Sequence, residues 1–162
     1  MLVLGIDPGT AITGYGLVTE SPEGRLCAGA FGVIRTSPEI NPGQRLLILY
    51  KELHKIVDLH HPQCGTVEKL FFQKNVATAL AVGQARGVAL LALADFNIPT
   101  SEYTPMEVKQ AVCGYGGASK NQVQQMVKIL LNLDALPEPD DAADALAIAI
   151  CHLNSIKMKS LG

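Results

Sequence analysis

The stretch Leu2-Val-Leu-Gly-Ile-Asp-Pro-Gly-Thr10 decides how this chain folds. Its apolar run, residues 2–6, has the length of a strand and is typical of a strand buried on both faces of a sheet. The run stops at Asp7, Pro8 and Gly9, which are turn-forming residues. A carboxylate at the rim of a buried sheet must be paired, solvated or bound to a metal. On this stretch alone, Asp7 is equally well a turn residue that hydrogen-bonds its own backbone or a ligand.

Two further strands are expected directly after the first one. Residues 13–19 and Leu26–Arg35 have strand-like composition, and the turn sequence Ser21-Pro-Glu-Gly24 lies between them. Short connections of this kind favour an antiparallel arrangement of neighbouring strands. The sheet is therefore expected to begin as an antiparallel meander.

A helix and a fourth strand bring a second carboxylate to the first. Asn41 and Pro42 are favoured as N-cap and first helical residue, and apolar residues then recur at helical spacing. The strand that follows, Cys64–Glu68, also ends on an acid. A strand that returns after a helical crossover lies parallel to its predecessor, and open α/β sheets carry their sites at the carboxyl ends of strands. Asp7 and Glu68 are therefore expected side by side at one sheet edge.

The middle of the chain combines aromatic and apolar residues. Phe71 and Phe72 stand next to each other in a polar loop, where they are either buried anchors or a surface on which bases stack, and burial of at least one is the simpler expectation. Residues 76–96 are strongly apolar but are interrupted by Gln84 and Arg86, which favours a buried helix over a membrane span. Arg86 is expected to be a paired structural residue.

Two lysines stand in helices that follow the expected fifth strand, residues 98–103. The capping boxes Thr104-Pro-Met-Glu107 and Ser119-Lys-Asn-Gln122 predict two helix starts. Lys109 lies in the first of these helices, and Lys120 in the first turn of the second. A cation in a first turn opposes the helix dipole. Lys120 therefore either contacts a negative group such as a phosphate or is an ordinary solvated side chain.

The last helix, expected from Asp141 to about residue 155, begins among acids. Asp140, Asp141 and Asp144 are favourable near a helix N-terminus, and capping explains one or two of them. Asp144 shares a helix face with either of the other two. Residues 145–150 are so apolar that they must pack on the sheet, which directs the acids to the edge that carries the first two carboxylates.

Composition describes one globular domain, residues 1–162, with 48% hydrophobic and 17% charged residues. The net charge of −2 gives no global positive field for nucleic acid, unless the 13 basic residues gather on one face. The four cysteines are scattered without a C-x-x-C pair, so they are expected to be free thiols, and a zinc site is not expected. The N-terminus lacks the basic region of a signal peptide. These features predict a soluble cytoplasmic protein.

The acids from three distant segments suggest a metal site. Carboxylates without a matching His or Cys set suit Mg²⁺ or Mn²⁺. Two such ions about 4 Å apart can activate a water molecule and stabilise the leaving oxygen in phosphodiester cleavage. Clustered carboxylates also do not all ionise comfortably without cations.

Four motifs carry a family resemblance. They are Gly5-Ile-Asp-Pro-Gly-Thr10, Thr13-Gly-Tyr-Gly16, Gly83-Gln-Ala-Arg-Gly-Val88 and Asp141-Ala-Ala-Asp-Ala-Leu-Ala147. In this order and spacing they resemble the RuvC family of Holliday-junction resolvases, from the first residue to about residue 152. The resemblance implies an α/β protein of ribonuclease-H-like fold, with a five-stranded mixed sheet flanked by helices.

The resemblance also implies an activity: a magnesium-dependent endonuclease that works as a homodimer and nicks two opposed strands of a four-way DNA junction. A metal-activated water would leave a 5′-phosphate and a 3′-hydroxyl. Mn²⁺ can substitute, two ions per site are expected, and the partner is the branch-migration motor of recombination. The family's motifs assign the residues of the site: Asp7, Glu68, Asp141 and Asp144 as catalytic and metal-binding acids, Lys120 in catalysis and DNA contact, and Phe71 and Lys109 in DNA contact.

Asp140 lies just outside the family's D-A-A-D pattern, so a capping role is expected for it. Two other classes of protein compete with the resolvase. A phosphotransferase of the actin and sugar-kinase type has a similar G-I-D-x-G-T loop, but it needs a second domain for which 162 residues leave no room. A catalytically silent DNA-binding protein on the same fold would not need four acids.

Overall fold

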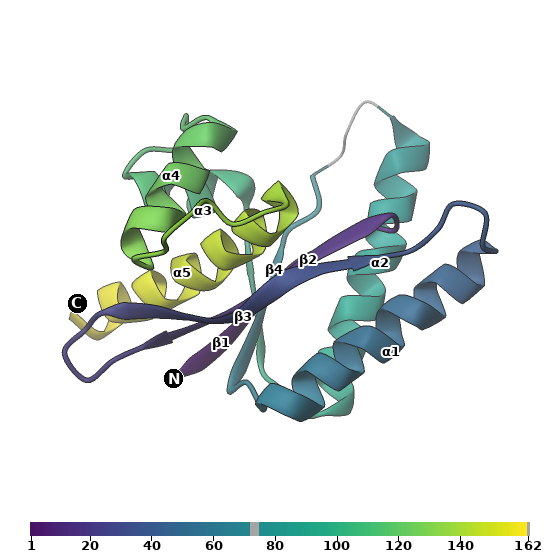
Figure 1. The fold of residues 1–162 in the computed structure, drawn as a ribbon, viewed down its shortest axis with the longest axis horizontal. Coiled ribbons are helices and arrows are strands. Elements are labelled where there is room, and N and C mark those ends of the chain that lie inside the picture. The colour runs from purple at the N-terminus through teal and green to yellow at the C-terminus, as the bar shows by residue number, and fades with distance from the viewer. Residues whose placement is uncertain (72–74, 162) are drawn as a thin grey trace.

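The computed structural model describes residues 1–71 and 75–161, and in this part of the chain it contains one five-stranded mixed sheet with helices on both faces (Figure 1). The strand order is β3-β2-β1-β4-β5. β1 (Leu2–Asp7), β2 (Ile12–Glu20) and β3 (Leu26–Arg35) form the antiparallel meander, and β4 (Cys64–Glu68) and β5 (Thr100–Tyr103) run parallel to β1. The fold expected from the sequence is confirmed, although β5 starts two residues later than predicted.

β1 is the central strand, and this position explains its unbroken apolar run. Val3 faces one hydrophobic core, and Leu4 and Ile6 face the other; all three are inaccessible to solvent. A strand covered on both faces buries successive residues rather than alternate ones. Asp7, at its end, is the first residue of the run that reaches the edge of the sheet.

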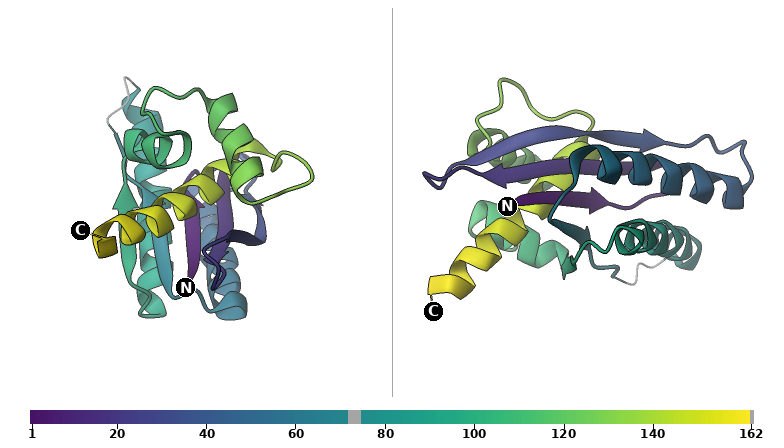
Figure 2. Two further views of the ribbon diagram at one scale, coloured as in Figure 1. Left: turned by 90° about the vertical axis from the view of Figure 1, so that its left-hand side faces the viewer. Right: turned by 90° about the horizontal axis from the view of Figure 1, so that it is seen from below.

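The first face of the sheet is covered by α5 (Asp140–Leu161), with α3 (Pro105–Cys113) and α4 (Lys120–Leu130) packed against that helix (Figures 1 and 2). α5 begins one residue earlier than predicted and continues about six residues further. Glycines let it approach closely, because a β-carbon on Gly5 would overlap the carbonyl oxygen of Ala145. The helix that carries the predicted acids therefore lies directly on the strand that carries Asp7.

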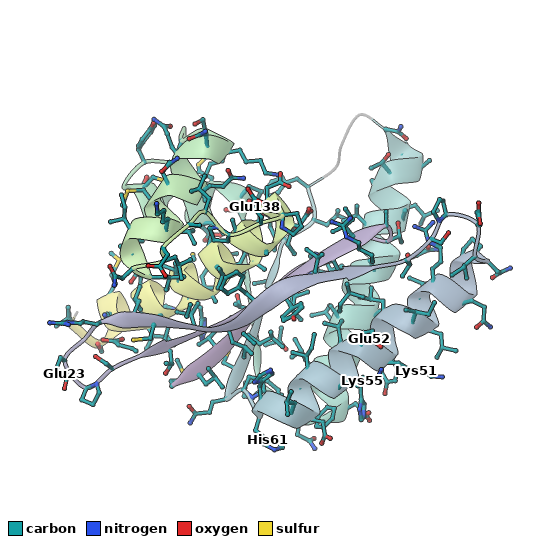
Figure 3. All side chains as sticks on the ribbon, viewed as in Figure 1. Glu23, Lys51, Glu52, Lys55, His61 and Glu138 are labelled. Carbon is teal, nitrogen blue, oxygen red and sulfur yellow. The ribbon has the colours of Figure 1, made fainter. Side chains whose placement is uncertain are left out.

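The second face is covered by α1 (Pro42–His60) and α2 (Val76–Asp95). The side chain of Asn41 caps α1 by accepting a hydrogen bond from the backbone N–H of Gly43, as the sequence predicts. The outward side of α1 is charged, and the Lys55 ammonium lies 2.6 Å from the Glu52 carboxylate there (Figure 3). α1 is thus an amphipathic surface helix.

The helix predicted over residues 76–96 is present, but the prediction that it is buried is wrong. α2 buries mainly small residues, whereas Val76, Leu80 and Leu91 are 78%, 63% and 59% exposed. Its packing partners are α1 and β4, which cover one side only. By length and composition α2 is also the one helix in the described residues that could cross a membrane, with 22% of its most apolar window buried. The expected pairing of Arg86 is confirmed, because its guanidinium forms an ion pair with Glu102.

Candidate active site

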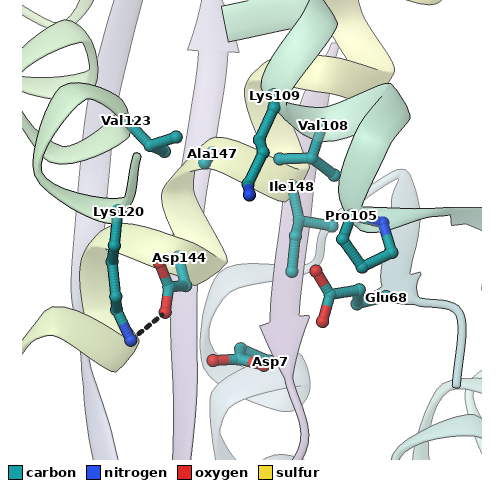
Figure 4. A pocket seen from close by; sticks show the side chains of 10 residues that line it. All are labelled: Asp7, Glu68, Pro105, Val108, Lys109, Lys120, Val123, Asp144, Ala147 and Ile148. Carbon is teal, nitrogen blue, oxygen red and sulfur yellow. Dashed lines mark ion pairs between the residues drawn. The ribbon is translucent and has the colours of Figure 1, made fainter. Parts of the chain in front are cut away.

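The parallel pairing of β1 with β4 places two acids together. Ile6 is in register with Val67, so the next residue of each strand, Asp7 and Glu68, comes to the same edge of the sheet. Both carboxylates line one cavity of about 210 Å³ (Figure 4). The side-by-side arrangement expected from the sequence is present.

α5 brings a third acid to this cavity. Asp144, in the second turn of the helix, lines the cavity with the first two carboxylates (Figure 4). Asp141 lies one turn earlier, and its backbone carbonyl packs so closely on Gly14 that a β-carbon there would overlap it. Asp141 is outside the cavity lining, but its charge still acts on Asp7. The structure therefore unites three of the four predicted acids in the cavity and leaves the fourth beside it.

The carboxylates disfavour one another's ionisation. Burial, together with the negative charges of Asp144, Glu68 and Asp141, raises the pKa of Asp7 to about 8, although the charge of Lys120 opposes the shift. The pKa of Glu68 is also raised, by burial and then by Asp144, although Lys109 and Lys120 oppose the shift. The cluster thus carries negative charge that the protein compensates only in part.

Lys120 is the cation closest to the acids. Its Nζ lies 2.7 Å from Oδ2 of Asp140. It also lies 3.1 Å from Oδ2 of Asp144 (Figure 4). These contacts raise the pKa of Lys120 and lower that of Asp140. The pKa of Asp144 is raised all the same, because burial outweighs the lysine there. Lys120 thus stands in a first turn against the helix dipole because acids of α5 face it. Asp140 is its ion-pair partner, and the capping role expected for Asp140 stays a prediction.

Lys109, which projects from α3, also lines the cavity (Figure 4). A second hollow, of about 220 Å³, begins at Asp7 and Glu68 and extends to Phe71. Phe71 is 57% exposed, so it is not a buried anchor, whereas Phe72 lies outside the described residues. This second hollow connects the acids to an exposed aromatic ring.

Two contacts that support residues of the site were not predicted from the sequence. The Nε of Arg86 donates a hydrogen bond of 3.4 Å to the carbonyl oxygen of Glu68, so the Arg86–Glu102 pair also holds the end of β4. The partnership of Asp140 with Lys120 joins residues of two different helices. The one available signal was the spacing of Asp140 and Asp144, which places both on one face of α5.

The donor set of the cavity fits a hard divalent cation. Its acidic side chains offer carboxylate oxygens, with no His or Cys among the lining residues. In residues 1–71 and 75–161, no three His, Cys, Asp or Glu side chains already converge on one point, and an ammonium group is the cation nearest to Asp144. The raised pKa values show that added positive charge would stabilise the ionised carboxylates.

Comparison with known proteins gives concordant matches. Residues 3–152 match the family model described as "Crossover junction endodeoxyribonuclease RuvC". A protein of that description from Roseiflexus sp. (strain RS-1) is 54% identical over 155 residues, which cover 96% of this chain and 92% of the relative. The structure of Thermus thermophilus RuvC superposes with a TM-score of 0.91 at 35% identity and covers 98% of this chain and 97% of the other. A structure titled "T. thermophilus RuvC in complex with Holliday junction substrate" gives a TM-score of 0.89 at 32% identity, covering 98% and 96%.

Proposed function

Because this chain belongs to the RuvC family of crossover junction endodeoxyribonucleases, we propose that it resolves four-way (Holliday) DNA junctions by hydrolysing phosphodiester bonds at the acidic cavity. The observation that carries the proposal is that Asp7, Glu68 and Asp144, from two strands and a distant helix, line one cavity. A relative of the same fold has been solved with a Holliday junction substrate. The role of this enzyme is then in homologous recombination and DNA repair.

Nucleases of this family depend on a divalent metal. We assign Mg²⁺, with Mn²⁺ as a substitute, and two ions per site held by Asp7, Glu68, Asp141 and Asp144. When bound, such ions lower the pKa of a water nucleophile and stabilise the leaving oxygen. Asp7 is proposed as the central ligand, because the charges of all three other acids act on it and raise its pKa together with burial.

The lysines of the cavity act on the phosphate. Lys120 projects from α4 to the acidic edge, where its ammonium group can neutralise charge that develops on the phosphate oxygens. Lys109, which lines the same cavity from α3, can hold the same phosphodiester by its charge. The products of this hydrolysis are a 5′-phosphate and a 3′-hydroxyl.

Phe71 offers an exposed ring for DNA at the end of the second hollow. A base unstacked at the centre of a junction can stack on such a ring. Phosphate contacts by the nearby basic residues would supply salt-dependent affinity despite the net charge of −2. Phe71 and Lys109 are thus our candidates for junction contact.

Two opposed nicks require two active sites, and we propose a homodimer. α2 provides a surface for it: at 100° per residue, Leu80, Gln84, Gly87 and Leu91 share one face. Leu80 and Leu91 are largely exposed on this face, and a β-carbon added at Gly87 would meet no other part of the described residues within 4 Å. A cytoplasmic location and association with the branch-migration motor of recombination complete the proposal.

A labelled four-way junction and a linear duplex, each with and without Mg²⁺, test this function. Paired symmetric nicks in the junction alone are expected. Asp7→Asn and Asp144→Asn should lower the cleavage rate by about a hundredfold or more, since even residues that only orient metal ligands contribute about 10–100-fold. Both variants should still bind the junction in a gel-shift assay.

Asp58→Asn is the matched control, because Asp58 is an exposed acid on α1, away from the cavity. It should cleave at the wild-type rate. Retained cleavage in either cavity variant would remove that residue from the mechanism. ATP turnover without nicking would overturn the nuclease assignment itself.

A further inference from the structure

We propose that Asp140 is a positioning residue: it holds the ammonium group of Lys120 at the rim of the acidic cavity while a divalent cation takes Asp144. Asp140 lies outside the D-A-A-D motif of the family. The inference rests on the proposed function, since it assigns a task to Lys120 in the same site.

The geometry joins three side chains from two helices. Lys120 reaches from the first turn of α4 to the first turns of α5, where its Nζ contacts Asp140 at 2.7 Å and Asp144 at 3.1 Å. The two acids are four residues apart on α5 and so present their carboxylates on one face. Lys120 is therefore shared between two carboxylates.

The two carboxylates are not equivalent. Asp144 lines the cavity and its side chain is 26% exposed, whereas the side chain of Asp140 is 48% exposed and does not line the cavity. A cation in the cavity would bind Asp144 and leave Asp140 free of metal. Only one of the two partners of Lys120 is thus available to the metal.

A divalent cation and an ammonium group repel each other strongly when they share one carboxylate. Metal binding at Asp144 therefore weakens the longer of the two lysine contacts. Lysine is a long, flexible side chain that gains rotamer freedom when it is released to water. Asp140 prevents this release by retaining the ammonium group 2.7 Å away.

A capping role for Asp140 is separable from this positioning role. Asparagine is as good an N-cap as aspartate, so Asp140→Asn preserves a cap but removes the charge that holds Lys120. Asp140→Glu keeps the charge on a longer side chain. The two variants together distinguish a helix-stabilising residue from one that acts through Lys120.

The test follows the reactivity of Lys120 itself. Wild-type protein, Asp140→Asn and Asp140→Glu are treated with acetic anhydride, with and without saturating Mg²⁺, and acetylation of Lys120 is measured by mass spectrometry. In Asp140→Asn, Mg²⁺ should accelerate acetylation about threefold, the size expected from loss of one partly exposed ion pair. In the wild type and in Asp140→Glu, Mg²⁺ should leave the rate nearly unchanged. Lys128, at the far end of α4, is the internal control.

Cleavage kinetics give the second readout. Asp140→Asn should lower kcat on the junction about tenfold at saturating Mg²⁺, with an unchanged KM, and Asp140→Glu should restore most of kcat. Equal responses of Lys120 to Mg²⁺ in the wild type and Asp140→Asn would overturn the inference, whether or not the wild type cleaves junctions. Failure of the wild type to cleave would overturn the proposed function instead.

Discussion

Helices α5 and α2 are both long and apolar, yet most of α5 is buried and the outer side of α2 is exposed. From Ala142 to Leu153, every residue of α5 except Asp144 is buried. In α2 the buried residues are four alanines and Leu93. The difference comes from what each helix meets. The backbone of α5 lies on glycines of β1 and β2, whereas α2 packs beside α1 and meets Gly65 of β4 only through the side chain of Leu93. Apolar composition alone therefore does not determine how deeply a helix is buried.

The two helices also differ in what they position. α5 carries its acids into a rigid, fully packed layer, which suits a site that must hold several like charges at fixed distances. α2 begins after the Phe71 loop and keeps a hydrophobic face available for another molecule. Helix α5 thus positions the acids of the site, and helix α2 offers a surface for association with another molecule.

The sharpest test of this contrast is one added methyl group. Gly5→Ala places a β-carbon against the Ala145 carbonyl, so β1 and α5 must separate. We expect a loss of more than about 4 kcal/mol in the free energy of unfolding, or no folded protein, because the clash is with backbone. Gly87→Ala on α2 meets no atom and should stabilise by about 0.5–1 kcal/mol. Urea denaturation of both variants measures the difference, and similar values would refute the contrast.

The next effect concerns the charge of Asp7, at the end of β1. Without metal, the pKa of Asp7 is about 8 in the folded protein, well above the ordinary value of 3.8. Between these values the folded state binds a proton that the unfolded state does not, so stability falls as pH rises from about 4 to about 8. Asp7→Asn removes this loss and should be more stable than the wild type by about 2–3 kcal/mol at pH 8.5, with little difference at pH 4.

Thermal unfolding in EDTA at the two pH values measures this effect of Asp7. Mg²⁺ should stabilise the wild type at pH 8.5 but not Asp7→Asn, because binding to the folded state alone adds stability. A difference between the two proteins that does not change with pH would show that Asp7 is ionised in the fold at both values.

Substitutions on the exposed face of α2 are expected to change the free energy of unfolding of one chain very little. Leu80→Glu combined with Leu91→Glu should change it by less than about 0.5 kcal/mol, since both side chains are exposed. The same double variant should convert a dimer to a monomer in sedimentation analysis. Ile129→Glu, at a residue of α4 that is 66% exposed, is the control and should leave the dimer intact. An unchanged dimer in the α2 variant would place the interface elsewhere.

The smallest effect on the fold is expected for Phe71→Ala, because more than half of this side chain is exposed. Junction cleavage should nevertheless weaken by about 5–100-fold, the equivalent of roughly 1–3 kcal/mol for a lost stacking contact. Denaturant unfolding and cleavage kinetics on the same preparation separate the two effects. An unchanged cleavage rate would exclude Phe71 from the junction contacts.

The sequence predicts most of this fold because its local signals agree with one another. The apolar run before Asp7, the Asn41-Pro42 start and the two capping boxes all mark elements that the structure contains. The placement of Asp7 beside Glu68 followed from the parallel crossover. These features depend on neighbouring residues or on a general rule of chain connection, and both are readable from one sequence.

The exposure of α2 and the partner of Lys120 were not readable in this way. The burial of a helix depends on which surfaces the rest of the chain offers, and α2 has the apolar composition of a core helix without the surroundings of one. The contact of Lys120 with Asp140 depends on how α4 is placed against α5. Such contacts between elements arise in the tertiary fold and have no local sequence signal.

The close contact of Gly5 with α5 has a consequence for the motions of the site. Because β1 and α5 touch through their backbones in the core, neither can open while the other stays folded. The amide hydrogens of Gly5 and Ala145 should therefore exchange with solvent only through unfolding of the entire molecule. The acidic cavity would then survive thermal fluctuations that fray the ends of the chain, and the enzyme would lose its active site only by losing its native state.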